Sequence, residues 1–207
     1  MAAVFTVISL TTLGALVFKD TLEKSGKIDV ISNVNKKKYS VIRTGRYMEA
    51  ADMLASLEEK ARDFIKEASA KYPNDPAIAR IKEYWTGSLT EIPQSDTIAY
   101  ALEKKNLFMC VRDNLGNVQK LDDLFFVLLH ELSHLANVTY GHNDSFWKQF
   151  KRTLEMANKL GHLPYANYDE YSVQVCGKII NSNPASCVFN GSCESELSDI
   201  TPIRPSR

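Results

Sequence analysis

The sequence predicts a helix-rich α+β fold with a small sheet, preceded by an N-terminal transmembrane helix. Three features indicate this fold class: an uncharged N-terminal segment, stretches of helical periodicity, and a β-rich stretch between residues 97 and 112. The 207 residues divide into an anchor at 1–19, a juxtamembrane linker at 20–38, a domain at 39–184 and a flexible tail at 185–207. A domain of about 150 residues is long enough to bury its own core.

The N-terminal segment carries no charge from Ala2 to Phe18, and these 17 residues lie at the short end of the ~17–25 needed to cross a bilayer. It lacks the basic start and the Ala-x-Ala site of a secretory signal peptide. We therefore expect an anchor in a lipid membrane, in preference to a cleaved signal, a buried helix or an apolar strand. Six lysines follow between positions 19 and 38 and none precedes, so the domain is expected on the cytoplasmic side.

Two helices are predicted in the first half of the domain. From Glu49 to Tyr72, apolar residues recur at three- and four-residue steps with charged residues between them. A second helix is expected from Pro76 to Trp85, before Gly87. Both helices are expected to pack around a third, more apolar helix that begins near residue 122.

The third helix contains the most informative motif of the chain, His130-Glu131-Leu132-Ser133-His134, after a start that Asp122 and Asp123 can cap. On a helix, positions i and i+4 lie on one face about 5–6 Å apart, so both imidazoles can reach one ion at about 2.0–2.1 Å. Glu131 can reach a water bound to that ion and remove its proton. The motif therefore predicts one catalytic Zn²⁺, with Glu131 as the base.

A catalytic zinc site uses three protein ligands and leaves one position open. His142 is the first choice for the third ligand, because it follows a predicted helix end at Tyr140-Gly141 where glycine permits a left-handed turn. Four later residues remain open as alternatives, namely Glu155, His162, Asp169 and Glu170.

A fourth helix is expected from about Ser145 to Leu160, with Phe146, Trp147 and Phe150 on the face that packs against the zinc helix. Beyond it lies a tyrosine-rich stretch. Tyr171 is the candidate to donate a hydrogen bond to the oxyanion that develops during hydrolysis, although the chain has nine tyrosines.

These residues resemble the WLM and SprT-like zinc metallopeptidases, a gluzincin-type group whose signature is a zinc helix, a third histidine and a nearby Phe-Trp pair. The resemblance is narrower to the small membrane-anchored WLM-like peptidases of large DNA viruses, and it spans roughly residues 40 to 182. The third histidine follows the second by eight residues, where cellular WLM proteins usually have six. The matching segments are Tyr100–Arg112, His130–His134, Gly141-His142, Phe146-Trp147 and Tyr171–Gly177.

The resemblance implies that residues 39–184 form a zincin-like domain that hydrolyses peptide bonds, in a host or virion membrane. It also implies that the segment from Leu107 to Arg112 is an edge strand that pairs with an extended substrate. Cellular relatives cut proteins crosslinked to DNA. Here 25 basic and 25 acidic residues balance, with no basic stripe near the motif, so no nucleic-acid partner is evident.

Four cysteines in 207 residues do not make a disulfide scaffold, and no Cys-x-x-Cys indicates a structural zinc. Cys110 and Cys176 are expected as buried small residues. Cys187 and Cys193 can close a loop in an oxidising compartment.

The sequence thus predicts a membrane-anchored zinc endopeptidase whose partners are a protein or peptide substrate and a lipid membrane. Two alternatives remain: a catalytically inactive zincin-like binding module, and a zinc hydrolase of non-peptide amides.

Overall fold

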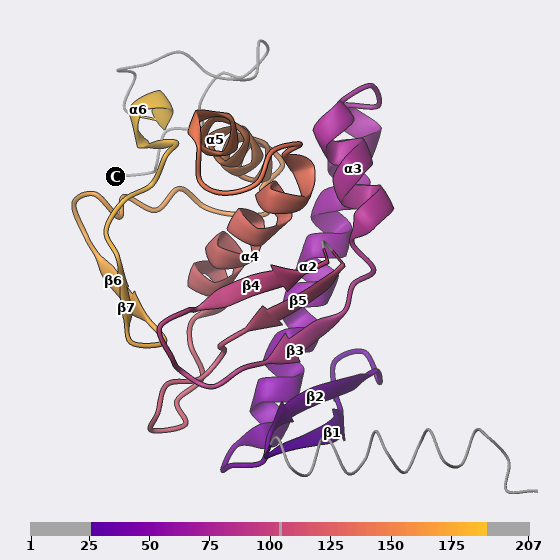
Figure 1. Cartoon of the computed structure of the whole chain (residues 1–207), viewed down its shortest axis with the longest axis vertical. Helices are drawn as coiled ribbons and strands as arrows, with labels where there is room; N and C mark the ends of the chain where they lie inside the picture. The colour runs from indigo at the N-terminus through magenta and orange to yellow at the C-terminus, as the bar shows by residue number, and fades with distance from the viewer. Residues whose placement is uncertain (1–25, 104, 190–207) are drawn as a thin grey trace, which may run out of the picture.

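The computed structural model describes residues 26–103 and 105–189. A five-stranded mixed sheet has the strand order β1-β2-β3-β5-β4, and helices α2 and α4 pack on one of its faces (Figure 1). Helices segregated to one side of a mostly antiparallel or mixed sheet define an α+β architecture. The strands are β1 (Lys27–Ile31), β2 (Lys38–Ile42), β3 (Leu89–Glu91), β4 (Ala99–Leu102) and β5 (Asn106–Met109).

The two helices expected in the first half are present as α2 (Tyr47–Lys71) and α3 (Pro76–Tyr84). Helix α2 buries its apolar face against the strands and against α4. Asp75 caps α3 by accepting hydrogen bonds from the backbone N–H groups of Ala77 and Ile78, at 2.9 and 3.0 Å. Both helices therefore form where the periodicity and the capping residues indicate.

The most apolar helix, α4 (Leu121–Ala136), lies at the centre of the domain and contacts α2, α3, α5 and β4. Its run of apolar residues from Leu124 to Leu129 is buried throughout. Helix α5 (Asp144–Lys159) follows α4 after a short loop and packs against it, and Asn143 caps α5 by accepting a hydrogen bond from Phe146 N at 3.1 Å. A second hairpin, β6 (Val173–Val175) and β7 (Lys178–Ile180), and the short helix α6 (Ser186–Phe189) follow.

The fold-class prediction needs one correction. Within residues 26–103 and 105–189, no helix is both long and apolar enough to cross a bilayer. Even α4 has only 16 residues, with two aspartates in its first turn, whereas a membrane span needs about 20 mostly apolar residues. The fold of the described residues is therefore α+β without a transmembrane helix. The anchor placed at 1–19 lies outside these residues.

Two domain boundaries also shift. The predicted linker at 20–38 overlaps β1 and the start of β2, which form an antiparallel hairpin with Val30 and Tyr39 directed into the core. The alternation of apolar and polar residues in this hairpin is short, and the lysines and asparagines of the turn obscured it in the sequence. At the other end, Ala185 and Val188 are buried, so the domain continues into the predicted tail at 185–207.

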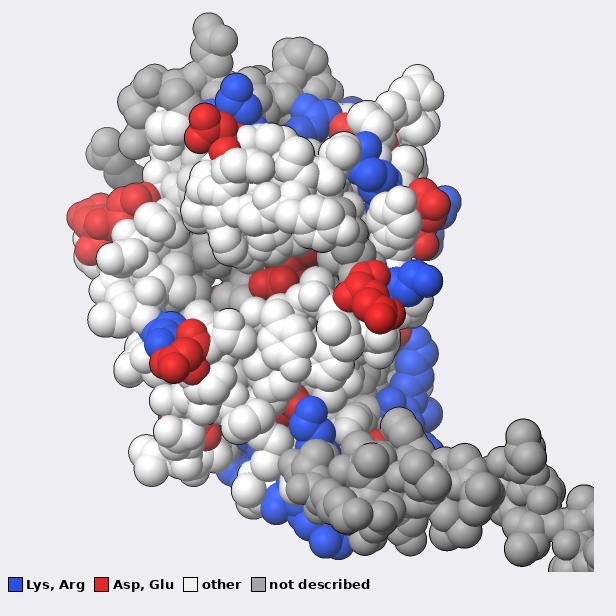
Figure 2. Space-filling view, viewed as in Figure 1, with Lys and Arg blue, Asp and Glu red and all other residues white. Residues whose placement is uncertain are grey.

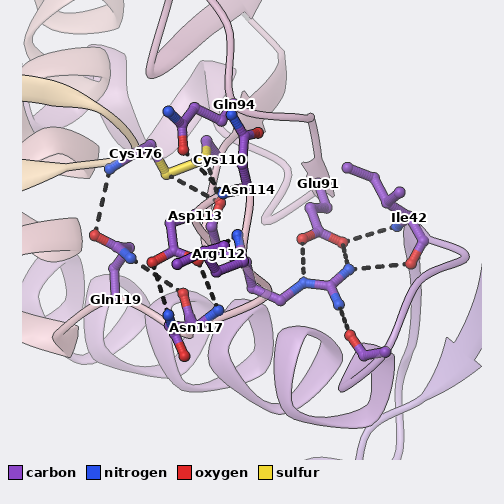
Figure 3. Close-up of polar contacts among 12 residues, drawn as sticks. Ile42, Glu91, Gln94, Cys110, Arg112, Asp113, Asn114, Asn117, Gln119 and Cys176 are labelled. Atoms are coloured by element: carbon purple, nitrogen blue, oxygen red, sulfur yellow. Dashed lines mark hydrogen bonds and ion pairs between the residues drawn. A yellow bond between two sulfur atoms is a disulfide. The ribbon is translucent and has the colours of Figure 1, made fainter.

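A buried ion pair joins the sheet to the segment before α2 (Figure 3). Arg112 donates to Glu91 through Nε at 2.7 Å and Nη2 at 2.9 Å, and the two side chains are 3% and 1% exposed. Arg112 also donates to the carbonyls of Ile42 and Gly45, and Ile42 N donates to Glu91 at 2.8 Å. Buried charges persist where they are paired and fully hydrogen-bonded.

Candidate metal centre and cleft

Helix α4 carries three of the predicted site residues. His130 and His134 are one turn apart on the same face, and Glu131 lies beside His130 with 5% of its surface exposed. All three line one cleft of about 1020 Å³. The i, i+4 spacing therefore directs both imidazoles and the carboxylate into a common space.

The start of α4 differs from the prediction. Lys120 occupies the N-cap position and no side chain caps the helix, so the capping role expected of Asp122 and Asp123 is wrong. The two aspartates accept hydrogen bonds from Lys60 at 3.0 Å and from Tyr168 at 2.7 Å. Long-range partners outcompete the local cap, and they hold the helix against α2 and against the segment after α5.

The structure brings His142 to the two helix histidines. Its Nε2 lies 2.9 Å from Nε2 of His130 and 3.2 Å from Nε2 of His134. Tetrahedral zinc with Zn–N bonds of about 2.0–2.1 Å separates its nitrogen ligands by roughly 3.3 Å, so this convergence fits a shared ion. Three aromatic nitrogen donors are a ligand set that zinc accepts. The three histidines can therefore hold the metal that the motif predicts.

The alternative third ligands are placed elsewhere. Glu155 is buried in α5, and His162 lies 3.1 Å from Glu67. Asp169 accepts a hydrogen bond from Ser186, and Glu170 accepts one from Asn167 at 2.9 Å. Among the described residues, only His130, His134 and His142 form a group of three potential ligands with converging atoms.

The loop that carries His142 is held by side-chain hydrogen bonds. Helix α4 ends at Ala136, earlier than the predicted end at Tyr140-Gly141, and Asn137 follows as its C-cap. The Asn137 amide donates to Thr139 Oγ1 at 2.9 Å and accepts from Ser145 Oγ at 2.7 Å. Gly141 has φ of 80°, the left-handed conformation expected at this position. Hydrogen bonds between side chains of the loop and the start of α5 therefore hold the loop in place.

Phe146 contacts all three histidine rings. It is fully buried, it stacks on His134 with ring centroids 4.1 Å apart, and it lies 4.8 Å from both His130 and His142. Phe150 lies 5.0 Å from His130, and the 43% exposed Trp147 lies 5.7 Å from His142. The expected packing of this aromatic face on α4 is confirmed, and it restricts the orientation of each imidazole.

Burial sets the protonation of the site. It lowers the pKa of His130 to about 3, with further lowering by His134 and His142, so His130 is neutral at pH 7 and can donate a lone pair. Burial also raises the pKa of Glu131 to about 7. A dication nearby would favour the carboxylate and lower this pKa again. A carboxyl group poised near neutrality suits a general base.

The cleft runs between α4 and strand β4. Figure 2 shows a hollow across this face with uncharged atoms along both sides and acidic atoms in its depth. Strand β4 is the edge of the sheet, whereas β5, which contains the first half of the predicted edge segment Leu107–Arg112, pairs on both sides. The edge-strand assignment is therefore wrong by one strand, because the chain makes a β4–β5 hairpin whose first strand lies outermost.

The free edge of β4 can offer backbone hydrogen bonds to the cleft. Cys110 N donates to Ile98 O at 2.8 Å, which makes this a hydrogen-bonded pair of the antiparallel ladder. Because such pairs alternate along the ladder, the N–H and C=O groups of Ala99 and Ala101 point away from β5. Both alanines line the cleft.

Tyr171 is not brought to the cleft. It is 70% exposed, it follows Glu170 in the segment before β6, and it is not among the cleft-lining residues. Tyr84, Tyr100 and Tyr140 do line the cleft. Tertiary packing, which the spacing of tyrosines does not reveal, decided which phenols lie near the metal centre.

The cysteines form a link that the sequence reading missed. Cys110 and Cys176, both buried as expected, are joined by a disulfide with a Cα–Cα distance of 6.2 Å. It fastens the β6–β7 hairpin to the end of β5 (Figure 3). Cys187 is also disulfide-bonded, and Cys193 lies outside the described residues. The signal available in the sequence was the even number of cysteines.

Comparison with known proteins finds similarity to two viral proteins. An uncharacterized protein of Acanthamoeba polyphaga mimivirus is 25% identical over 194 residues, which cover 86% of this chain and 97% of that protein. An uncharacterized protein of Invertebrate iridescent virus 6 is 37% identical over 76 residues, which cover 35% of this chain and 40% of that protein. No family model and no solved structure matches. Both of these relatives are viral proteins.

Proposed function

We propose that this protein is a zinc-dependent endopeptidase of the WLM-like type, which hydrolyses peptide bonds with a metal-bound water. The observation that carries the proposal is the convergence of three histidine nitrogens beside a buried glutamate in a cleft bordered by a free strand edge. A closed structural site would have a fourth protein ligand. The described residues supply three, which suits a catalytic ion.

The chemistry follows from the positions of the side chains. His130, His134 and His142 would hold Zn²⁺, which when bound lowers the pKa of its water to about 7 and polarises the scissile carbonyl. Glu131 accepts the proton of the attacking water and delivers it to the leaving amine. Glu131 is buried, which limits the access of bulk water to this proton transfer.

The substrate is positioned by backbone pairing. An extended peptide beside β4 can accept from and donate to Ala99 and Ala101, adding a strand to the sheet. Their small side chains leave the space between β4 and α4 open, and backbone pairing does not depend on substrate sequence. This arrangement favours a peptide over a small non-peptide amide, because a small amide cannot use the length of the strand edge.

The test measures zinc content and peptide cleavage on the full chain. Wild type is expected to hold one zinc and to cleave unstructured peptides. Glu131→Gln should retain zinc and lose activity by roughly 10²–10⁴-fold, the usual contribution of a general base. His142→Ala should lose zinc affinity, whereas the control His162→Ala should retain it, because His162 pairs with Glu67 outside the cleft.

Each alternative function has its own outcome. A chain that binds no zinc and cleaves no peptide would be an inactive binding module. Zinc binding with cleavage of small amides alone would indicate an amide hydrolase. Full activity in Glu131→Gln would contradict the proposed mechanism directly.

A further inference from the structure

The β6–β7 hairpin forms the wall at one end of the cleft. Lys178 and Ile180 of β7 line the cleft, while Ile179 between them is 68% exposed and does not. In Figure 1 the hairpin lies beside the start of β4, at the end of the cleft away from α3. Because side chains alternate along a strand, β7 presents one face to the cleft and the other to solvent.

This wall is fastened to the core of the domain. The two turn residues, Cys176 and Gly177, have φ of 48° and 78°, as a two-residue type I′ turn requires. Cys176 is bonded to Cys110, and its N–H donates to Gln119 Oε1 at 3.3 Å. A disulfide and a backbone hydrogen bond at the tip hold the hairpin at a defined distance from α4.

The end of the cleft beside the hairpin is apolar. Phe126 and Val127 come one helical turn before His130, so they border the metal centre, and they are 6% and 7% exposed. Ile98, which immediately precedes β4, lines the same cleft as Ile180. Charged side chains lie at the outer edge of the cleft, where Lys178 Nζ is 3.3 Å from the carboxylate of the exposed Asp96. Most of the side chains at this end of the cleft are therefore apolar, while Glu131 and Lys178 line the same cleft.

The direction of β4 decides which substrate residue reaches this pocket. Strand β4 begins at Ala99 near the hairpin and ends at Leu102 near α3 (Figure 1). Antiparallel strand pairs are about two- to three-fold commoner than parallel ones. A substrate antiparallel to β4 has its C-terminal side at the hairpin, so the residue after the scissile bond lies beside Phe126, Val127 and Ile180.

We propose that the β6–β7 hairpin, with Ile180 as its key side chain, builds the pocket for the residue that follows the scissile bond and selects an uncharged aliphatic or aromatic side chain there. This inference rests on the proposed peptidase function. A charged side chain would lose hydration against the apolar side chains of this pocket. An apolar side chain gains by leaving water, at roughly 25 cal/mol per Å² of apolar surface.

The experiment compares two matched variants of the full, zinc-loaded chain. Peptides that differ only in the residue after the cleaved bond are digested, and products are identified by mass spectrometry. For wild type, leucine or phenylalanine at that position should be preferred over lysine by at least roughly tenfold in kcat/KM. Ile180→Glu should reverse this ratio, whereas Ile179→Glu, the same change on the exposed face, should leave it unchanged.

A second pair of readouts separates specificity from folding. Zinc content and thermal unfolding are measured for both variants, and if Ile180→Glu does not fold, Ile180→Ala is used. The enlarged pocket of Ile180→Ala should shift preference from leucine towards phenylalanine and tryptophan. Equal preferences in the Ile180 and Ile179 variants would overturn the assignment, as would selectivity at the residue before the cleaved bond. A zinc-loaded wild type that cleaves no peptide would reject the proposed function itself, and this inference with it.

Discussion

The sheet side of the domain and the segment from 137 to 189 are stabilised in different ways. Residues 27–112 form a regular sheet and two helices around a continuous apolar core, with one ion pair fully buried. The later segment has one long helix, and its loops are held by side-chain hydrogen bonds and a disulfide. The later segment also contributes buried side chains to the core, mainly from α5, so the difference between the two regions lies in how its loops are held.

The candidate site lies where these regions meet. Helix α4, packed on the sheet side, supplies His130, Glu131 and His134. The later segment supplies His142 and the hairpin wall of the cleft. Under the proposed function, the sheet side would hold the reacting groups, while the later segment would complete the metal site and shape the substrate pocket. Sites on rigid elements hold their geometry best, and loops adapt specificity.

The largest effect should come from the sheet side. Arg112→Met leaves Glu91 buried without its counter-ion, and breaking such a pair costs about 3–5 kcal/mol of unfolding free energy. Denaturant unfolding measures the loss. The exposed pair of Arg46 and Glu49 supplies the control, and Arg46→Ala should cost much less, because exposed pairs are screened by solvent. The zinc affinity of the folded Arg112→Met chain should stay unchanged. A marked fall in zinc affinity would show that the sheet side and the later segment do not act independently.

An intermediate effect should come from the loop that carries His142. Asn137→Ala removes the hydrogen bonds to Thr139 and Ser145, so zinc affinity should fall by about 10–100-fold, as for other residues that orient metal ligands. Chelator competition measures it. Asn183→Ala is the matched control. Asn183 is also buried and is hydrogen-bonded to Ala166 and Ala185, but it does not contact the loop that carries His142. Equal zinc affinities in the two variants would show that the brace is dispensable.

The smallest effect concerns the pH dependence of the metal-free protein. Burial raises the pKa of Glu131 to about 7 from 4.5, so its contribution to stability is complete below pH 4.5 and is lost as pH rises through 7. Glu131→Gln lacks this loss, so its stability advantage over wild type should grow by about 1 kcal/mol between pH 5 and pH 6. Urea unfolding after chelation measures the gap. Glu170→Gln, at an exposed carboxylate, should show no comparable change.

Local sequence determined the helices and the first part of the site. The periodicity of residues 49–72, the Pro-Asn-Asp-Pro stop and the Asn143 cap act within one or two turns, so their outcome depends little on the rest of the chain. The two histidines of α4 share a face for the same reason, because the helix alone sets the spacing of i and i+4.

Only the tertiary structure decided the features that join distant segments. The cap expected at Asp122 and Asp123 gave way to Lys60 and Tyr168, and the outermost strand is β4 because the chain folds back through the β4–β5 hairpin. The pairing of Cys110 with Cys176 spans 66 residues. Such contacts form only after loops close and elements pack, and no periodicity in the sequence encodes them. The sequence determined that two histidines and a glutamate share one helix, and the packing of the later segment brought His142 and the β6–β7 hairpin to the same cleft.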